Sequence, residues 1–492
     1  VLKGPSAITQ GPYTVGGAIN LLSTPIADES GGLINQEIGE DGTSRTHIHY
    51  SAVGTNSAIL IESHTWETDG FDSVNGSSAD TGFDKDDLVI KLRLNSDPSD
   101  DGIYHELNVK YQDSGEKSNQ SYVGLANADF RKDAHARYGL SAYDNMDNSH
   151  DTTSFNYVVD FGNLEISTTM YENDFARNWF KVDKIDNNKV YGHGNSINNI
   201  ISAANAGETT ASSILNGTNT QAVQIKLKNN NRAYTSKGTD LKLQYNTDKQ
   251  SLTIGYRETE DTEDRFQVYA TTDWVGSKLG ALTVGSEPGY SPNNRLTIAE
   301  AAAFYINEEF NFGALTVNVG FRSEEWEISQ DRYVDAARSA IATGNGYPKK
   351  LADSDNSLMG FGATYYVNDT TQLFVGFHEG FTPTGGGADP EEADNMEMGV
   401  RYVKDNTYFE VVYFNTDYQN MFGECTASGG ATGSCEIGDS FNAGEASISG
   451  FEIVAQTERA GESGTKYPLS MVYTSTDASF DNTFDSDFWG SV

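Results

Sequence analysis

Two cysteines are the side chains in this sequence best suited to covalent or metal chemistry. Cys425 and Cys435 stand ten residues apart in a segment rich in Gly, Ser and Thr. Two sulfur ligands with no nearby histidine cannot close a zinc site, whereas a short disulfide on an exposed loop suits an oxidising compartment outside the cytoplasm. We therefore expect a local disulfide between Cys425 and Cys435.

Histidines and acidic runs are the remaining candidates for metal chemistry. His47 and His49 would share one face of a β-strand, and we expect a pair that lines a lumen or an interface rather than a metal site. The acidic runs Asp97 to Asp101 and Glu258 to Asp264 lack the spacing and the glycine of an EF-hand, so solvated turns are expected there rather than calcium sites. No Gly-x-Ser-x-Gly elbow, Walker loop, His-Glu-x-x-His or paired-cysteine motif occurs. The sequence therefore predicts a protein that is not an enzyme and has no resident cofactor.

Composition narrows the class of protein. Of the 492 residues only 37% are hydrophobic, and no run approaches the ~18 consecutive apolar residues of a membrane helix. A transmembrane β-barrel stays possible, because its strands need apolar residues only at alternate positions, and 26 Tyr, 24 Phe and 5 Trp would supply its aromatic girdles. With 33 Lys and Arg against 71 Asp and Glu, the net charge of −38 argues against nucleic-acid binding.

Alternation of apolar and polar residues is the dominant pattern along the chain. It predicts β-strands with one apolar and one polar face. In a soluble sandwich the apolar face would pack on a second sheet, while in a barrel it would face lipid and the polar face would line a wet lumen. The pattern is found at residues 88–94, 107–111, 241–245, 252–256, 315–321, 359–365 and 396–402.

The connections between these segments alternate in length, which favours a barrel over a sandwich. Short breaks such as 161–163, 246–250, 311–314, 367–371 and 404–407 read as hairpin turns. Long polar segments lie between them, at roughly 185–222, 260–292, 331–354, 381–394 and 419–441. Short turns at one end and long loops at the other are typical of an outer-membrane barrel.

The number of strands and both ends of the chain predict a fragment. We count about 17 strands, although bacterial barrels have an even number. Residues 484–492, FDSDFWGSV, end in loop-like sequence, and the chain begins at Val1 inside a motif. We therefore expect a chain cut at both ends.

The first residues are punctuated by turn-forming pairs. Val1 to Ile26 reads VLKGPSAITQGPYTVGGAINLLSTPI, in which Gly-Pro and Gly-Gly pairs force tight bends. This order of residues ahead of a β-rich region resembles the end of the plug domain of TonB-dependent outer-membrane receptors. The resemblance implies that 1–27 is the C-terminal remnant of a plug and 28–492 an incomplete barrel, which has about 22 strands in the family.

Further stretches are similar to the ferric-citrate receptor type of this superfamily. They are 68–93, 171–183, 377–402 and 441–457, of which the last two are widely shared among TonB-dependent receptors. The resemblance implies a monomeric receptor in the outer membrane of a Gram-negative bacterium, in contact with lipid and lipopolysaccharide. Such a receptor binds a ferric chelate at the cell surface and imports it with energy from the inner-membrane TonB complex. Cobalamin, a nickel chelate or a glycan are alternative ligands, and a passive porin-like channel is the alternative class.

The resemblance also implies candidate ligand-binding residues, because the ferric-citrate receptor binds its ligand through arginines in the first half of the barrel. Approximate alignment places Arg232 and Arg265 at comparable positions, with Arg177 and Arg257 as nearby candidates and Tyr13 of the plug remnant below the ligand. Guanidinium groups suit an anionic chelate, since they bind carboxylates through two parallel hydrogen bonds. Each arginine could instead pair with a neighbouring acid, such as Glu258, Asp261 or Asp264.

Overall fold

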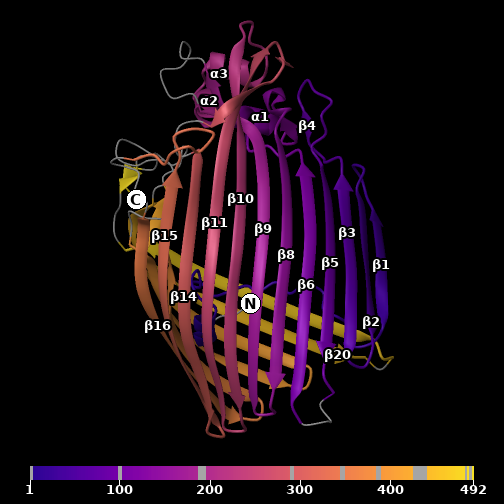
Figure 1. Cartoon of the computed structure of the whole chain (residues 1–492), viewed down its shortest axis with the longest axis vertical. Helices are drawn as coiled ribbons and strands as arrows, with labels where there is room; N and C mark the ends of the chain where they lie inside the picture. The colour runs from indigo at the N-terminus through magenta and orange to yellow at the C-terminus, as the bar shows by residue number, and fades with distance from the viewer. Residues whose placement is uncertain are drawn as a thin grey trace.

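The computed structural model describes residues 4–97, 102–186, 196–288, 293–343, 350–383, 389–424, 440–461, 463–481, 485–486 and 490–491. Long antiparallel strands dominate this part of the chain, and consecutive strands pair with one another (Figure 1). Seventeen of them form one curved wall, since the 19-stranded sheet also contains two short loop strands. The seventeen are β1 (Gly31–Ile38), β2 (Ser44–Val53), β3 (Ser57–Thr68), β5 (Phe83–Asn95), β6 (Tyr104–Ser118), β8 (Asn145–Asp160), β9 (Leu164–Asp186), β10 (Val223–Asn246), β11 (Gln250–Val275), β14 (Asn294–Asn311), β15 (Leu315–Arg332), β16 (Lys350–Asn368), β17 (Thr371–Thr382), β18 (Glu391–Lys404), β19 (Thr407–Glu424), β20 (Ser440–Ala460) and β21 (Lys466–Phe480).

The smaller elements lie in the connections. Two 3₁₀-helices, three short α-helices and six two- to six-residue strands belong to this group. They are η1 (Pro5–Thr9), β4 (Ser73–Val74), α1 (Asn127–Lys132), β7 (Ala136–Arg137), η2 (Gly139–Ser141), α2 (Ile197–Asn205), α3 (Thr209–Leu215), β12 (Lys278–Leu279), β13 (Thr283–Pro288), β22 (Asp485–Ser486) and β23 (Gly490–Ser491). No helix in the described ranges is long and apolar enough to cross a membrane.

The all-β fold, the strand count and the hairpin turns confirm the sequence prediction. All seven alternating segments lie in strands of the large sheet, and the five short breaks each join two adjacent strands. These turns gather at one end of the sheet, which we call the turn end, and the helices gather at the other, the loop end, at the top of Figure 1. Within the described residues β1 pairs only with β2 and β21 only with β20, so the wall is open between them.

The N-terminal segment identifies the two faces of the wall. It lies behind the front strands in Figure 1, where the Arg257 Nη1 donates to the Gln10 carbonyl at 2.9 Å and the Tyr13 amide donates to the Phe381 carbonyl at 2.9 Å. Ile8 is buried in a small cluster with Trp326 and Phe381. We call the face that meets this segment the inner face and the opposite one the outer face.

The outer face carries an apolar band towards the turn end. Leu243, Ile254, Ile306, Phe321 and Met359 pair in register across five strands, and Met359 is 60% exposed. A continuous exposed apolar surface of this kind suits contact with lipid. The alternation in the sequence is therefore explained by two environments, one on each face.

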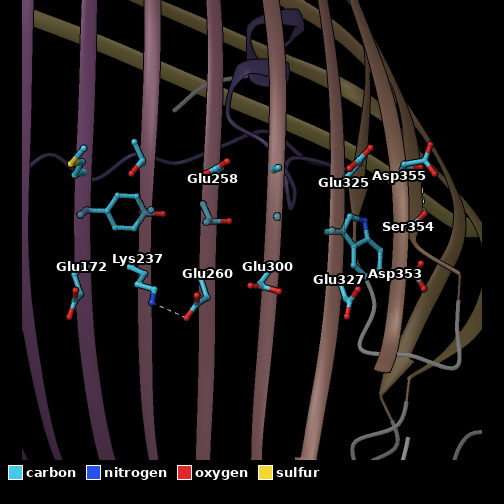
Figure 2. A pocket seen from close by; sticks show the side chains of 18 residues that line it. Glu172, Lys237, Glu258, Glu260, Glu300, Glu325, Glu327, Asp353, Ser354 and Asp355 are labelled. Atoms are coloured by element: carbon cyan, nitrogen blue, oxygen red, sulfur yellow. Dashed lines mark hydrogen bonds and ion pairs between the residues drawn. The ribbon is translucent and has the colours of Figure 1, made fainter. Parts of the chain in front are cut away.

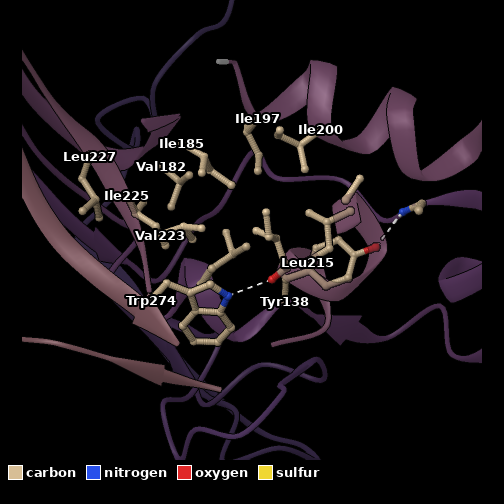
Figure 3. Packing of buried hydrophobic residues seen from close by; sticks show 14 of the residues in the cluster. Tyr138, Val182, Ile185, Ile197, Ile200, Leu215, Val223, Ile225, Leu227 and Trp274 are labelled. Carbon is tan, nitrogen blue, oxygen red and sulfur yellow. Dashed lines mark hydrogen bonds between the residues drawn. The ribbon is translucent and has the colours of Figure 1, made fainter. Parts of the chain in front are cut away.

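Three strands extend well beyond this band and carry a compact cap at the loop end. Helices α2 and α3 pack Ile200, Ile214 and Leu215 against Val223 of β10 and Trp274 of β11. Figure 3 shows the labelled side chains of this cluster converging. The Trp274 Nε1 donates to the Ile214 carbonyl at 2.7 Å. We call this cluster and its helices the cap.

The cap and the long strands correct three sequence predictions. The segment 185–222 contains two helices with a buried core, where only a polar loop was expected. Residues 260–275, 350–354, 381–382, 391–394 and 419–424 are strand rather than loop, because these strands continue past the apolar band, in places through stretches such as 258–265 that are polar on both faces. The run from Glu258 to Asp264 lies in β11, so the solvated turn expected there is also wrong.

Candidate ligand-binding site

Five arginines stand in one row across five neighbouring strands, near the loop end. Arg232 on β10 pairs in register with Arg177 on β9 and with Arg265 on β11. Arg265 pairs with Arg295 on β14, which pairs with Arg332 on β15. Adjacent Cα atoms in such a ladder lie about 5 Å apart. We call these five residues the arginine row.

The arginine row belongs to the inner face. Arg265 and Arg257 are separated by an even number of residues on one strand, so their side chains leave the same face. Arg257 contacts the N-terminal segment through Gln10, which fixes that face as the inner one. Eight residues separate the two arginines, so the row lies about 26 Å closer to the loop end than Arg257.

Glu263 lies beside the middle of the arginine row, two residues closer to the turn end than Arg265 on the same strand. Its Oε1 is 2.9 Å from the Arg232 Nη1 and 3.5 Å from the Arg265 Nη2, and its Oε2 is 3.0 Å from the Arg295 Nη2. Arg265, Arg295 and Glu263 are each only about 15% exposed at the side chain, so water screens these contacts poorly. One carboxylate thus binds three guanidinium groups.

Aromatic and further basic residues continue the inner face beyond the row. The Lys181 ammonium lies 3.9 Å from the ring centre of Tyr122 and 3.8 Å from that of Trp179. Lys228 pairs in register with Lys181, and its ammonium is 3.9 Å from Asp183. We call the arginine row together with Glu263, Trp179, Lys181 and Lys228 the basic wall.

Positive charge dominates this surface. The four inner-face rows from Glu263 to Lys181 hold seven cations, five Arg and two Lys, against the carboxylate of Glu263, and Asp183 beside the last row pairs with Lys228. This local excess contrasts with the net charge of −38 for the whole chain. The four rows are Phe175, Tyr234, Glu263, Thr297 and Gln330; the arginine row; Trp179, Asn230 and Gln267; and Lys181, Lys228 and Tyr269.

The cap holds the strands of the basic wall from the other side. Val182, Leu227 and Ala270 alternate with inner-face residues of β9, β10 and β11 and are fully buried in the cap core. At its edge Asp144 is buried and accepts hydrogen bonds from the Ser121 hydroxyl at 2.7 Å and the Val182 amide at 2.8 Å. Burial raises the pKa of the Asp144 carboxyl to about 7, although both hydrogen bonds and the nearby Lys181 oppose the rise.

Three of the four arginines predicted from the sequence come together in the structure. Arg177, Arg232 and Arg265 are consecutive members of the arginine row. Arg257 lies apart from them, with its Nε 2.8 Å from Asp240 and its Nη1 on Gln10. The acid that pairs with Arg232 and Arg265 is Glu263, rather than Glu258, Asp261 or Asp264.

Tyr13 lies on the inner side, on the N-terminal segment. Its side chain is 69% exposed, it has a positive φ of 63°, and it lies near Asp261, two residues from Glu263. The structure therefore places Tyr13 nearer the turn end than the arginine row, with its ring accessible.

His47 and His49 do not join a metal site among the described residues, and residues 98–101 of the first acidic run lie outside them. His47 hydrogen-bonds Glu62 at 2.6 Å, and its ring centre is 5.5 Å from that of His49. Across the described ranges no three His, Cys, Asp or Glu side chains converge as metal ligands. Cys425 and Cys435 lie outside the described residues, so their disulfide stays a prediction.

Sequence reasoning missed Arg295, Arg332, Glu263, Lys181 and Lys228. Glu263 stands in a polar stretch where hydropathy has no period that assigns a face, whereas Lys228 lies in an alternating stretch, residues 223–228, whose pattern was not used. Counting residues from the hairpin turns would have found them, because a tight turn fixes the register of the two strands that follow it.

The outer face of the same strands carries the opposite charge. A groove of about 1000 Å³ runs across β9 to β16, and eight carboxylates but only one lysine line it. Figure 2 shows Glu172, Lys237, Glu260, Glu300 and Glu327 following one another across the strands, with the N-terminal segment behind them. Lys237 is paired with Glu260 at 2.9 Å. This groove is unsuited to an anion, so the inner face is the candidate site.

Comparison with known proteins extends these observations. A family model described as TonB dependent receptor-like, beta-barrel matches residues 41–491. Among solved structures, the unliganded ferric citrate transporter FecA is 15% identical with a TM-score of 0.66, over 98% of this chain and 65% of that one. The siderophore receptor PiuA from Acinetobacter baumannii is 14% identical with a TM-score of 0.70, over 99% and 70%.

The ferric yersiniabactin uptake receptor FyuA from Yersinia pestis is 13% identical with a TM-score of 0.61, over 96% of this chain and 64% of that one. This chain therefore spans about two thirds of the length of these three structures. At such low identity the likeness concerns the fold alone.

Proposed function

Because this chain belongs to the family of TonB-dependent receptor-like β-barrels, we propose that it forms the barrel of a receptor that binds an anionic ferric chelate at the cell surface. The loop end is then extracellular and the turn end periplasmic, as in other outer-membrane barrels. The proposed ligand is a carboxylate-bearing chelate of the ferric-citrate type.

The arginine row is the observation that carries this proposal. Guanidinium groups remain charged at all physiological pH values and bind carboxylates through two parallel N–H···O bonds. Three of them converge here within 3.5 Å of one carboxylate, Glu263, on the inner face. Seven inner-face cations suit an anionic ligand better than a neutral one, while a passive anion pore would also carry such cations and is distinguished by the plug sequence assigned to residues 1–27.

Transport is proposed to follow the scheme of the family. Residues 1–27 are assigned to the end of a plug, 28–492 to the barrel, and Tyr13 to the surface beneath the ligand. The contacts of Gln10 with Arg257 and of Tyr13 with Phe381 support a segment held inside the wall. The inner-membrane TonB complex would supply the energy, and the monomeric barrel would sit in outer-membrane lipid and lipopolysaccharide.

Binding of ferric citrate to the whole receptor tests the proposal. The variant R232A/R265A should bind about 100-fold more weakly or worse, because a hydrogen bond to a charged group contributes about 1.5–3 kcal/mol and 1.4 kcal/mol is tenfold in affinity. K237A is the matched control, since Lys237 is on the outer face of the same strand as Arg232. Equilibrium binding of radiolabelled ferric citrate to purified receptor is the measurement.

A cationic ferric trihydroxamate serves as the control ligand. Unchanged ferric-citrate binding by R232A/R265A would overturn the proposed site. If the wild type ignores ferric citrate but binds cobalamin, a nickel chelate or a glycan, the ferric-chelate function is wrong and the family assignment stands.

A further inference from the structure

Glu263 occupies the position where a ligand carboxylate would bind. It is the only carboxylate in the four described rows of the basic wall, and it spans three strands through Arg232, Arg265 and Arg295. Without it, three guanidinium groups on neighbouring strands, whose Cα atoms are about 5 Å apart, would repel one another in a poorly hydrated place. Glu263 is therefore the counter-ion of these three arginines.

The three arginines nevertheless have donors to spare. The Nε atoms of Arg232, Arg265 and Arg295 are buried and have no hydrogen-bond partner among the described residues. Leaving buried donors unpaired is costly, and a guanidinium normally meets a carboxylate with two donors at once. The row therefore has the capacity to bind more carboxylate than Glu263 supplies.

We propose that Glu263 competes with the ligand for the arginines and thereby selects for ligands with two or more carboxylates. This inference rests on the proposed function. A single free carboxylate offers the row no more charge than Glu263 already gives, and it must also give up its freedom of translation and rotation. Because Glu263 is tethered to the chain, its carboxylate has a large effective concentration at the arginines and outcompetes a ligand that has only one carboxylate. A polycarboxylate chelate gains over Glu263 because it brings extra charges to the donors that Glu263 leaves unpaired.

The substitution E263Q separates charge from shape at this position. We expect ferric citrate to bind E263Q about tenfold more tightly than the wild type, and acetate, which the wild type excludes, to bind detectably. E263D keeps the charge on a shorter stem and should stay within about threefold of the wild type. E260Q is the control, because it removes the same charge from the outer face of the same strand.

The measurement is binding of acetate, iron-free citrate and ferric citrate to the purified receptor, together with its melting temperature. Ferric-citrate binding that is unchanged or weaker in E263Q, with acetate still excluded, overturns the inference. If E263Q does not fold, the charge-free variant E263A is compared with E263D instead. Equal exclusion of acetate by these two variants then overturns the inference.

The two proposals fail separately. If R232A/R265A loses ferric-citrate binding and E263Q has no effect, the ferric-chelate function is supported and the proposed role of Glu263 as a competitor is wrong. If the wild type does not bind ferric citrate but E263Q gains acetate binding, the role of Glu263 as a competitor is supported and the ferric-chelate function is wrong.

Discussion

The buried carboxyl of Asp144 makes the cap more stable in acid. In the unfolded chain this group has the ordinary pKa of 3.8, whereas burial in the cap raises the pKa to about 7. The folded cap therefore holds a proton that the unfolded chain releases between these two values. The contribution of Asp144 to the stability of the cap is fully present below pH 4 and is lost as the pH rises through 7.

The size of the effect follows from the shift. A rise of about 3 pKa units corresponds to about 4 kcal/mol, at 1.36 kcal/mol per unit, between the protonated and ionised forms. D144N keeps one acceptor oxygen for the Val182 amide, and its NH2 group can donate to the Ser121 hydroxyl oxygen, but the side chain cannot ionise. We expect the variant to lose this pH dependence and to exceed the wild type in cap stability at pH 8.

Hydrogen exchange at the Val182 amide reports the effect directly, since this N–H donates to Asp144. After correction for intrinsic exchange, protection in the wild type should fall by up to about a thousandfold between pH 4 and pH 8. D144N should show a flat profile, and E208Q, which changes an exposed acid of the cap, should follow the wild type. Equal pH profiles for D144N and the wild type would refute the reasoning.

Four further predictions concern packing and chemistry elsewhere. W274A should destabilise the cap by about 3–5 kcal/mol through a cavity and a lost hydrogen bond to Ile214, seen as faster proteolysis within 196–222. R322A should cost about 3–5 kcal/mol because it leaves Glu324 charged and buried, and R322M/E324L should recover most of the melting temperature. G380V should loosen the N-terminal segment, because even a Cβ there would come within 2.9 Å of the Val15 Cα, and cleavage within 4–16 should accelerate. Cys425 and Cys435 should resist thiol labelling on cells until a reductant is added, and full labelling without reductant would contradict a disulfide.

Much of the wall was predictable from the sequence, because lipid and lumen impose a period of two. Leu243, Ile254 and Phe321 alternate with polar neighbours, and the tight turns between strands are short and rich in Gly, Asn and Asp. The strand count of about 17 followed from these two signals and is confirmed.

Beyond the apolar band the same reasoning lost its signal. Residues 260–265 are polar on both faces, so nothing in their hydropathy marks them as strand, whereas the alternation of Phe266, Val268 and Ala270 was a signal that was not used. The Asn- and Ser-rich setting of Ile197 and Ile200 concealed the cap helices. Arg232 and Arg265 were found by resemblance. Their alignment with Arg295 and Glu263 depends on strand register, which a hydropathy pattern does not contain.

The contrast between the basic wall and the acidic remainder of the chain bears on how fast a ligand arrives. Far from the surface, an anionic chelate meets the repulsion of a molecule with 38 excess negative charges, and only within reach of the seven cations does the force reverse. Salt shortens the range of both forces to about 8 Å at physiological ionic strength, which removes the distant repulsion before it removes the attraction at contact. The association rate of an anionic ligand should therefore rise as salt is first added and fall only at higher concentration, opposite to the steady decline of a wholly basic receptor.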